Sequence, residues 1–258
     1  MSLSAVIITR DESTRLPACL TSLSFADEIV VVDYGSVDGT PQLAASLGAR
    51  VTIAPDWPGF GAQKNRAVAQ AAGEWILSID ADERVTPSLR DSIVAAIASG
   101  SFDCYTLNRR SSYCGQYMLR SGWSPDPVLR LFRRGTASFS QDTLHERLVA
   151  TGPVGALDGD LLHESFADFE AVLDKVNRYS TASARALHER GERASFGKAL
   201  GHGLWAFLRT YVLRRGFLDG RLGLALAISN AEGTYYRYLK LWLMHRHRAP
   251  AQETAPRS

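Results

Sequence analysis

The sequence predicts an α/β fold in which a mostly parallel sheet is flanked by helices. Short apolar runs rich in β-branched residues occur at 3–8, 29–32 and 75–79. Between them, apolar residues recur every three or four positions, as in amphipathic helices. Strands that alternate with helices in this way are typical of a parallel sheet with right-handed crossovers and helices on both faces.

Local signals support the elements of the first half. The helix after the second strand has a clear start, because Thr40 and Pro41 provide an N-cap and a proline at the first helical position. A third strand is expected at 50–53, and a Pro- and Gly-rich loop at 55–61 precedes the next helix. That helix ends near Gly73.

The pattern changes after a helix that is expected from Pro87 to about Ala98. Separated strands follow, and we expect them to extend the sheet and to build a second wall of a crevice at its carboxyl edge. They lie at 104–107, 128–132 and 157–162. Three helices are expected after that, with glycine-containing breaks between them, at 169–190, 196–213 and 218–244.

Composition narrows the class of protein. With 45% hydrophobic and 22% charged residues, the 258-residue chain is an ordinary globular protein. Its net charge of +2 combines a net −5 up to residue 195 with a net +7 from residue 196 onward, which indicates an anionic membrane or nucleic acid as partner of the basic end. Three cysteines without a CxxC pair argue against a zinc ribbon and indicate a reducing compartment. We expect a cytoplasmic protein, because no signal peptide and no apolar run of the ~20 residues that span a bilayer is present.

Three carboxylates, Asp80, Asp82 and Glu83, directly follow the strand at 75–79. Groups so close repel one another unless they are solvated or share a cation. The carboxyl end of a buried strand is also where open α/β sheets bind ligands. One hypothesis is that Asp80 and Asp82 hold a divalent cation against a nucleotide diphosphate. The alternative is a solvated acidic turn before the next helix.

Asp33 holds a similar position at the end of the strand at 29–32. Gly35 and Gly39 follow it and allow a tight turn or close approach of a ligand. A carboxylate there can accept hydrogen bonds from a ribose hydroxyl or a base N–H, but it can equally form an Asx-type turn or a helix cap. A G-x-G-x-x-G fingerprint is missing, which argues against a nicotinamide enzyme.

Together, residues 30–40 (VVVDYGSVDGT), 79–83 (IDADE) and 9–11 (TRD) resemble the family 2 glycosyltransferases with the GT-A fold. The resemblance covers residue 3 to about 100 and implies a Rossmann-like sheet that binds a nucleotide sugar. Later stretches are similar to a bacterial subgroup that includes lipopolysaccharide core glucosyltransferases: 128–134, 144–147, 161–163 and 215–223.

The resemblance also implies a division of the chain. Residues 1–100 would form the nucleotide-sugar-binding half of a GT-A domain and 101–167 its acceptor-side half. A C-terminal helical region at 168–247 and a disordered tail at 248–258 would follow.

The resemblance assigns nucleotide contacts to several residues. Thr9 and Asp11 would border the base, and Asp33 would contact base or ribose. Lys64 matches the basic position that approaches the nucleotide. Tyr34 stands where a second acidic residue is common, so the base contacts are expected to differ. A UDP-sugar is the expected donor.

The same resemblance implies a metal site and a diphosphate contact. Asp82 would ligate the cation that bridges the diphosphate, and Asp80 would bind ribose or metal. His163, at the end of a strand, is a candidate third ligand that suits Mn²⁺ as well as Mg²⁺. A hydrogen-bonded structural role is the alternative for His163. Arg130, with its neighbours Arg133 and Arg134, can bind the diphosphate or an anionic acceptor, or can simply lie on the outer face of a strand.

Sugar transfer with inversion needs a base for the acceptor hydroxyl. Family members use an acidic residue after the Asp-x-Asp, so Glu146 is the candidate and Asp142 the second choice. The alternative for Glu146 is a surface carboxylate paired with Arg147 or Arg130.

The basic, aromatic-rich end has two interpretations. Aromatic and basic residues between 205 and 246 can bind an anionic membrane surface, which a lipid-linked acceptor would require. Alternatively they form a helical subdomain or the interface of a homo-oligomer. Nucleic acid is not expected, because no binding module accompanies the charge.

These observations predict a cytoplasmic, inverting, metal-dependent glycosyltransferase, placed on the inner face of the cytoplasmic membrane. It would move a hexose such as glucose to a saccharide acceptor, the lipopolysaccharide core. The alternatives are a sugar-nucleotide pyrophosphorylase and an inactive nucleotide-sugar-binding or membrane-scaffold protein. The absence of a glycine in residues 9–13 argues against the pyrophosphorylase.

Overall fold

The computed structural model describes residues 1–140 and 146–246. The chain forms two compact units, the first from residues 1–111 and 125–165 and the second from 112–124 and the described residues after 165. The tail predicted at 248–258 and the second-choice base Asp142 lie outside the described residues. Within the described ranges, none of the helices has the length and apolar character needed to traverse a bilayer.

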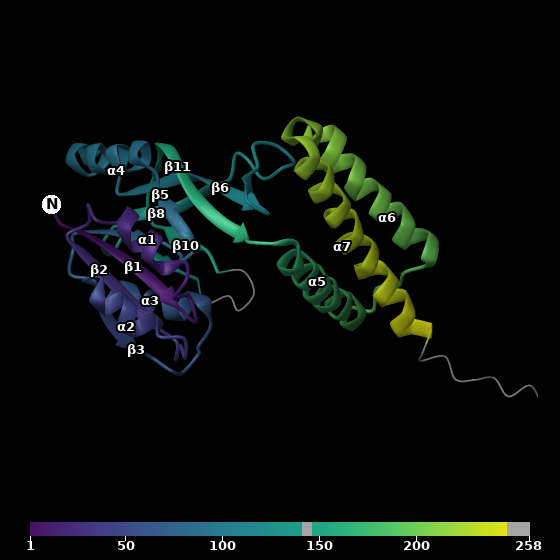
Figure 1. The fold of residues 1–258 in the computed structure, drawn as a ribbon, viewed down its shortest axis with the longest axis horizontal. Helices are drawn as coiled ribbons and strands as arrows, with labels where there is room; N and C mark the ends of the chain where they lie inside the picture. Colours follow the sequence, from purple (N-terminus) through teal and green to yellow (C-terminus); the bar gives the residue numbers. More distant parts are fainter. Residues whose placement is uncertain (141–145, 247–258) are drawn as a thin grey trace, which may run out of the picture. The chain divides into compact units, whose positions relative to one another are not determined.

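The first unit is an α/β structure (Figure 1). Its first half contains β1 (Leu3–Thr9), α1 (Leu16–Ser22), β2 (Glu28–Asp33), α2 (Thr40–Ser46), β3 (Arg50–Ile53), α3 (Phe60–Gln70), β4 (Trp75–Ser78), β5 (Glu83–Val85) and α4 (Pro87–Ser99). Its second half contains β6 (Cys104–Tyr113), β8 (Pro127–Arg133), β9 (Ala137–Phe139), β10 (Leu148–Ala150) and β11 (Val154–Phe166), where the last residues of β6 and β11 belong to the second unit.

The main sheet has the strand order β3-β2-β1-β4-β8-β6-β11-β5. The strands β3, β2, β1 and β4 are parallel, whereas β8 pairs antiparallel with both β4 and β6. The order reverses between β1 and β4, because β2 and β3 lie on one side of β1 and the later strands on the other. Such a switch point opens a crevice at the carboxyl ends of the strands, which is where open α/β sheets bind ligands.

Alternating side chains of the strands fill two cores, one on each face of the sheet. On one face, Ala5 and Ile7 of β1 pack with α1, α2 and α4. On the other face, Val6 packs with Ala67 and Ala71 of α3 and its C-cap. This period of two is expected for a strand buried on both faces. The predicted fold class, a GT-A-type sheet flanked by helices with a C-terminal helical extension, is confirmed.

The strand β5 of the first unit was not expected from the sequence. The acidic stretch does not run directly into the next helix, because Glu83–Val85 forms the short strand β5. It pairs antiparallel with β11, and His163 lies opposite Glu83 in the register. This pairing brings His163, distant in sequence, beside Asp82.

The second unit is mostly helical and contains the short strand β7 (Gln116–Tyr117). Its helices are α5 (Phe169–Glu189), α6 (Phe196–Leu208), a π-helical turn (Arg209–Leu213), a 3-10 turn (Gly216–Asp219) and α7 (Gly220–Arg246). The expected single helix at 196–213 therefore changes geometry at Arg209. Tyr113, Met118, Val172 and Leu226 form its buried core.

The stretch at 215–223 (RGFLDGRLG) forms a tightly packed turn of this unit. The buried Asp219 carboxylate accepts hydrogen bonds from the backbone N–H groups of Leu119 and Arg120 and from the Ser121 hydroxyl, at 2.8–3.1 Å. A Cβ atom on Gly223 would lie 2.0 Å from the carbonyl oxygen of Gly216. These glycines and this aspartate therefore hold the turn between the π-helical segment and α7, and their role is structural.

Candidate functional site

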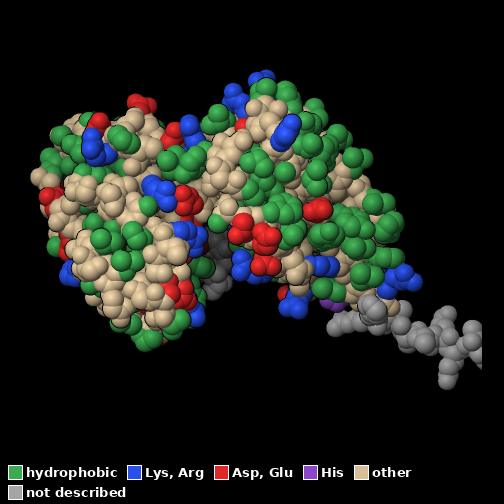
Figure 2. Space-filling view, viewed as in Figure 1, with side chains coloured by type: hydrophobic (Ala, Val, Ile, Leu, Met, Phe, Trp, Pro, Cys, Tyr) green, Lys and Arg blue, Asp and Glu red, His purple; other side chains and the backbone are tan. Residues whose placement is uncertain are grey.

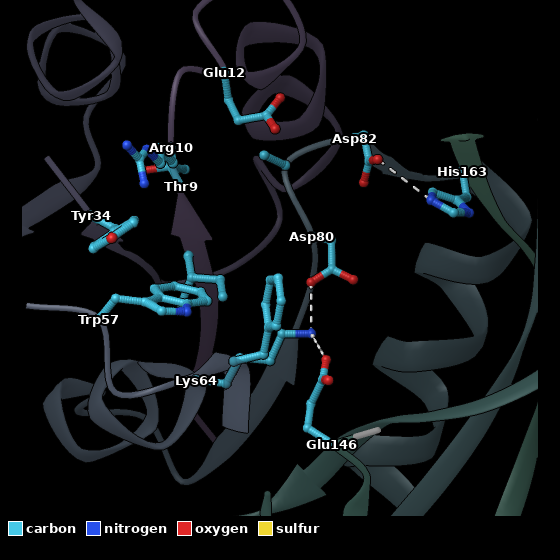
Figure 3. A pocket seen from close by; sticks show the side chains of 13 residues that line it. Thr9, Arg10, Glu12, Tyr34, Trp57, Lys64, Asp80, Asp82, Glu146 and His163 are labelled. Carbon is cyan, nitrogen blue, oxygen red and sulfur yellow. Dashed lines mark hydrogen bonds and ion pairs between the residues drawn. The ribbon is translucent and has the colours of Figure 1, made fainter. Parts of the chain in front are cut away.

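A cavity of about 570 Å³ opens at the switch point of the sheet (Figure 3). Of the predicted site residues, the structure brings six together in its lining: Thr9, Lys64, Asp80, Asp82, Glu146 and His163. Thr9 ends β1, Lys64 lies on α3, and the two aspartates follow β4. Asp11, Asp33 and Arg130 do not line it.

Asp80 is the centre of an ion-pair network. One of its carboxylate oxygens lies 2.9 Å from Lys64 Nζ, and the other lies 2.7 Å from Arg130 Nη2. Burial raises the pKa of Asp80, but the charges of Arg130 and Lys64 outweigh burial and hold that pKa well below its usual range. Asp80 is therefore a carboxylate whose two oxygens are already bound by protein cations, which disfavours it as a metal ligand.

Glu83 supports this network, and the sequence pointed to it only as one of three neighbouring carboxylates without a role of its own. It is fully buried and accepts a hydrogen bond from Arg130 at 2.7 Å and from the backbone N–H of Asp80 at 2.9 Å. Burial raises the pKa of Glu83, Arg130 opposes this, and the nearby Asp80 carboxylate raises it further. Glu83 thus fixes the backbone of the acidic turn and orients the guanidinium of Arg130.

Asp82 and His163 lie next to each other in the lining of the cavity. Asp82 Oδ2 lies 3.4 Å from His163 Nε2 (Figure 3). The other ring nitrogen, Nδ1, lies 2.9 Å from the hydroxyls of both Ser111 and Ser165, which leaves Nε2 toward Asp82. Arg15 lies 3.7 Å from the same Asp82 oxygen.

This pair fits a divalent cation. Two neighbouring ligands of one octahedral ion lie roughly 3 Å apart when each bond is about 2.1 Å, and the 3.4 Å between Asp82 Oδ2 and His163 Nε2 is close to that. The Ser111 and Ser165 contacts are of the kind that orients an imidazole toward a metal ion. No group of three or more His, Cys, Asp or Glu side chains suited to a metal exists in the part of the chain that is described. Oxygen atoms of a bound ligand would therefore have to complete the coordination.

Glu146 lies where two cavities meet. A second cavity of about 400 Å³ adjoins the first, and Lys64, Asp80 and Glu146 line both. Glu146 Oε1 is 3.5 Å from Lys64 Nζ. The second cavity is lined by further cations, Arg109, Arg130 and Arg147.

The first turns of α3 place Glu146. A Cβ atom on Gly61 would lie 2.0 Å from the carbonyl oxygen of Ser140 and 3.4 Å from Glu146 Cβ, so only glycine permits this close approach. Asn65 exchanges two 2.9 Å hydrogen bonds with the backbone of Phe139. Gly61 and Asn65 were not singled out from the sequence. Their positions, three residues before and one residue after Lys64 on the same helix, could have indicated that they belong to the site.

Aromatic side chains form the opposite wall of the first cavity. The Tyr34 and Trp57 rings are 4.6 Å apart, and Phe60 meets Trp57 edge to face at 4.8 Å. The Arg10 guanidinium lies 4.5 Å over the Tyr34 ring. Trp57 is 39% exposed and Phe60 51% exposed, so these rings present flat, accessible faces to a ligand.

Asp33 and Asp11 organise loops in this structure. The buried Asp33 carboxylate accepts hydrogen bonds from the Thr9 hydroxyl and from the backbone and hydroxyl of Ser36. Asp11 accepts from the backbone N–H of Val37 at 2.9 Å. The loops after β1 and β2 are thus tied together, and the nucleotide contacts expected for both aspartates remain predictions.

The remaining arginines of the predicted set lie elsewhere. Arg133 pairs with Glu74 at 2.6 Å, and Arg134 donates to the carbonyl oxygen of Gly73. Neither lines a cavity described above. Arg133 thus lies on the exposed side at the end of β8, the alternative considered for it, and Arg134 lies just after that strand.

Comparisons with known proteins agree with this architecture. Residues 4–148 match the family model described as Glycosyl transferase family 2. A lipopolysaccharide core biosynthesis glycosyltransferase, LpsC of Rhizobium meliloti strain 1021, is 34% identical, with 92% of this chain and 93% of LpsC covered. An uncharacterized glycosyltransferase of Rickettsia prowazekii, RP128, is 31% identical over 93% of this chain and 86% of its own.

Solved structures with some likeness include S. aureus TarS, which is 18% identical with a TM-score of 0.48 and covers 69% of this chain and 40% of TarS. Glucosyl-3-phosphoglycerate synthase from Mycobacterium tuberculosis, crystallised with Mn²⁺ and UDP, is 26% identical with a TM-score of 0.38 and covers 42% and 44% of the two chains.

The fold and the family-model match define the class of protein, a glycosyltransferase. More particularly, the chain belongs to glycosyl transferase family 2, and its relatives include LpsC. The pyrophosphorylase alternative is therefore set aside.

Proposed function

We propose that this enzyme transfers a hexose such as glucose from a UDP-sugar to a saccharide of the lipopolysaccharide core, with inversion and with a divalent cation. The observation that carries the proposal is the position of Glu146 between two cavities that share Lys64, Asp80 and Glu146. A base for a direct displacement must reach an acceptor on one side and a donor on the other. The likeness to LpsC supports the core saccharide as acceptor.

The first cavity suits the donor. The rings of Tyr34 and Trp57 offer a stacking surface for the base, and Lys64 lies where a leaving diphosphate needs positive charge. Asp82 and His163 would hold Mn²⁺ or Mg²⁺, which offsets negative charge on the departing diphosphate. The second cavity, with Arg109 and Arg130, suits an acceptor that carries hydroxyls and anionic groups.

With Glu146 as the base, every bond, proton and electron pair of the displacement is accounted for. The acceptor oxygen forms a bond to the anomeric carbon while the bond from that carbon to the diphosphate oxygen breaks. The acceptor proton passes to the Glu146 carboxylate, and the nucleoside diphosphate leaves with the electron pair. Lys64, 3.5 Å from Glu146, holds this carboxylate toward the shared wall of the two cavities.

The experiment is product analysis by NMR with UDP-glucose, Mg²⁺ and a deacylated core oligosaccharide as acceptor. Inversion predicts a β-linked glucose from the α-linked donor. An α-linked product would contradict the inverting mechanism, and donor binding without transfer or hydrolysis would favour an inactive binding protein.

We also propose that the second unit binds the inner, cytoplasmic face of an anionic membrane. Hydrophobic side chains gather over its helices (Figure 2), and those exposed on α6 and the following turns include Leu204, Trp205, Leu208, Leu213 and Phe217. Exposed cations, Arg209, Arg214 and Arg215, lie among them in sequence. A large apolar face with a basic rim is characteristic of proteins that lie on anionic bilayers.

Flotation with phosphatidylglycerol-containing vesicles tests this association. The double variant Leu204→Ser, Trp205→Ser should lose flotation, and Val94→Ser, an exposed apolar position on α4 of the first unit, should not. A homo-oligomer through the same helices is the alternative, and it would show as a dimer in light scattering that the double variant abolishes.

A further inference from the structure

A third cavity lies within the second unit and has no role in the transfer proposed above. Its volume is about 440 Å³. The walls come from α5, the π-helical turn, α7 and the loop at 121–123. All of its lining residues belong to this one unit.

The lining of this cavity is cationic. It contains four basic residues, Lys175, Arg209, Arg214 and Arg237, and no Asp or Glu. Across residues 1–140 and 146–246, no carboxylate lies within 4 Å of a side-chain nitrogen of Arg209, Arg214 or Arg237. Glu232, five residues before Arg237 on α7, does not line the cavity.

Arg237 provides the most specific observation. Its Nε atom is buried and has no hydrogen-bond partner within the described residues. A buried donor on a charged group is costly when unpaired, and an anion that accepts from the guanidinium would remove that cost. Guanidinium groups bind phosphate and carboxylate oxygens through two parallel hydrogen bonds.

The rest of the lining suits a sugar. Trp123 stacks on Phe166 at 6.1 Å and meets Tyr113 at the same distance edge to face, so flat rings form one wall. Hydroxyl and amide side chains, Thr210, Ser229, Asn230 and Thr234, form part of the remainder. Aromatic walls with a few polar groups are how proteins recognise small polar ligands that have one apolar face.

We infer that this cavity, centred on Arg237, Arg209 and Trp123, binds a saccharide that carries a phosphate group. The basic side chains bind the phosphate, and the Trp123 ring stacks on one face of the sugar. The inference rests on the proposed function in one respect, namely that the ligand is a saccharide. A phosphorylated part of the acceptor is an example. The simpler alternative, a solvated basic helix face, does not account for the buried Nε of Arg237.

The test is an NMR titration of the full chain labelled with ¹⁵N-tryptophan. Trp123 lines this cavity, whereas Trp57 lines the cavity at the switch point, so their indole N–H signals report the two sites separately. Glucose 6-phosphate should shift the Trp123 signal saturably and leave Trp57 unmoved. UDP with Mg²⁺ should do the reverse. Trp123→Phe and Trp57→Phe assign the signals.

Two further probes define the ligand class. Glucose should bind at least ten times more weakly than glucose 6-phosphate, and so should glycerol 3-phosphate, which carries the phosphate of a lipid headgroup without a sugar. Equal affinity for glucose would overturn the role of the cations. Equal affinity for glycerol 3-phosphate would overturn the role of the sugar.

Variants complete the test. Arg237→Gln and the exposed Arg209→Gln should each weaken glucose 6-phosphate at least tenfold, while Arg185→Gln, an exposed position on α5 outside the cavity, should not. Unchanged affinity in Arg209→Gln, which removes a surface charge without touching the core, would contradict the inference even if Arg237→Gln fails to fold. If UDP does not shift Trp57 while glucose 6-phosphate shifts Trp123, the proposed donor site fails and the phosphate site stands.

Discussion

The cavity at the switch point and the cavity of the helical unit differ in whether their basic side chains have carboxylate partners. In the first, Lys64 contacts one oxygen of the Asp80 carboxylate, Arg130 of the adjoining cavity contacts the other, and His163 faces Asp82. In the helical unit, Arg209 and Arg237 face a cavity that contains no carboxylate. A site whose cations are already paired has fixed geometry before any ligand arrives, as catalysis requires. A site whose arginines have no carboxylate beside them instead gains its counter-ion from the ligand.

The largest effect is expected for Glu146→Gln. General-base catalysis contributes about 10²–10⁴-fold, so the rate of transfer should fall by about that factor while UDP affinity stays within a few-fold. Steady-state kinetics and calorimetry with UDP measure the two quantities. The control is Asp91→Asn, an exposed carboxylate on α4 that pairs with its neighbour Arg90. Transfer within threefold of wild type would remove Glu146 from the role of base.

Arg130→Gln tests whether the paired network fixes the first cavity. It would leave the fully buried Glu83 with only the more distant Arg109, at 3.9 Å, and Asp80 with one of its two cations. Removing one partner of a buried pair costs about 3–5 kcal/mol. Urea unfolding should show a loss of that order. The matched change Arg133→Gln, on the same strand but exposed and paired with Glu74, should cost less than about 1 kcal/mol.

Gly61→Ala should have a smaller effect on stability. The added methyl group would meet the Ser140 carbonyl, and overpacking of this kind costs about 1–3 kcal/mol. Because the displaced backbone also leads to Glu146, the rate of transfer should fall too. Gly152→Ala, where nothing lies within 4 Å of the new atom, is the control and should change neither quantity.

The smallest effect is expected for the pH dependence of the free energy of unfolding, to which the ion-paired Asp80 carboxylate contributes. Since the pKa of Asp80 is lowered in the folded state, its stabilising effect is fully present above the unfolded pKa of about 3.9 and declines as the pH falls through the folded value. The difference in unfolding free energy between wild type and Asp80→Asn should therefore be constant from pH 7 to about 5 and shrink below about pH 4. A difference that grows on acidification would contradict the ion-pair network.

Sequence patterns located the first cavity because its residues follow strand ends. Thr9 and Asp80 come directly after buried apolar runs, and the carboxyl edge of a parallel sheet gathers such residues. Glu83 was not assigned a role of its own, because its burial depends on β5, a strand of three residues without a periodic signal. The Lys64–Asp80–Arg130 contacts likewise depend on pairing between β4 and β8, which local sequence does not encode.

In the helical unit, less of the site could be predicted from the sequence. Its aromatic and basic composition indicated a binding surface, but the helix spacing gave no sign that Trp123, from a loop some 80 residues earlier than Arg209, closes a cavity with that arginine. The stretch at 215–223 looked like a family motif, and in the structure Asp219 and Gly223 shape a turn.

The measurement that tests the account most directly is Mn²⁺ binding in the presence of UDP, followed by electron paramagnetic resonance. The account predicts that UDP strengthens Mn²⁺ binding to the wild-type protein and that Asp82→Asn and His163→Ala each weaken it at least tenfold, whereas Asp91→Asn leaves it unchanged. Mn²⁺ affinity that is the same in wild type, Asp82→Asn and His163→Ala would contradict a cation held between these two side chains.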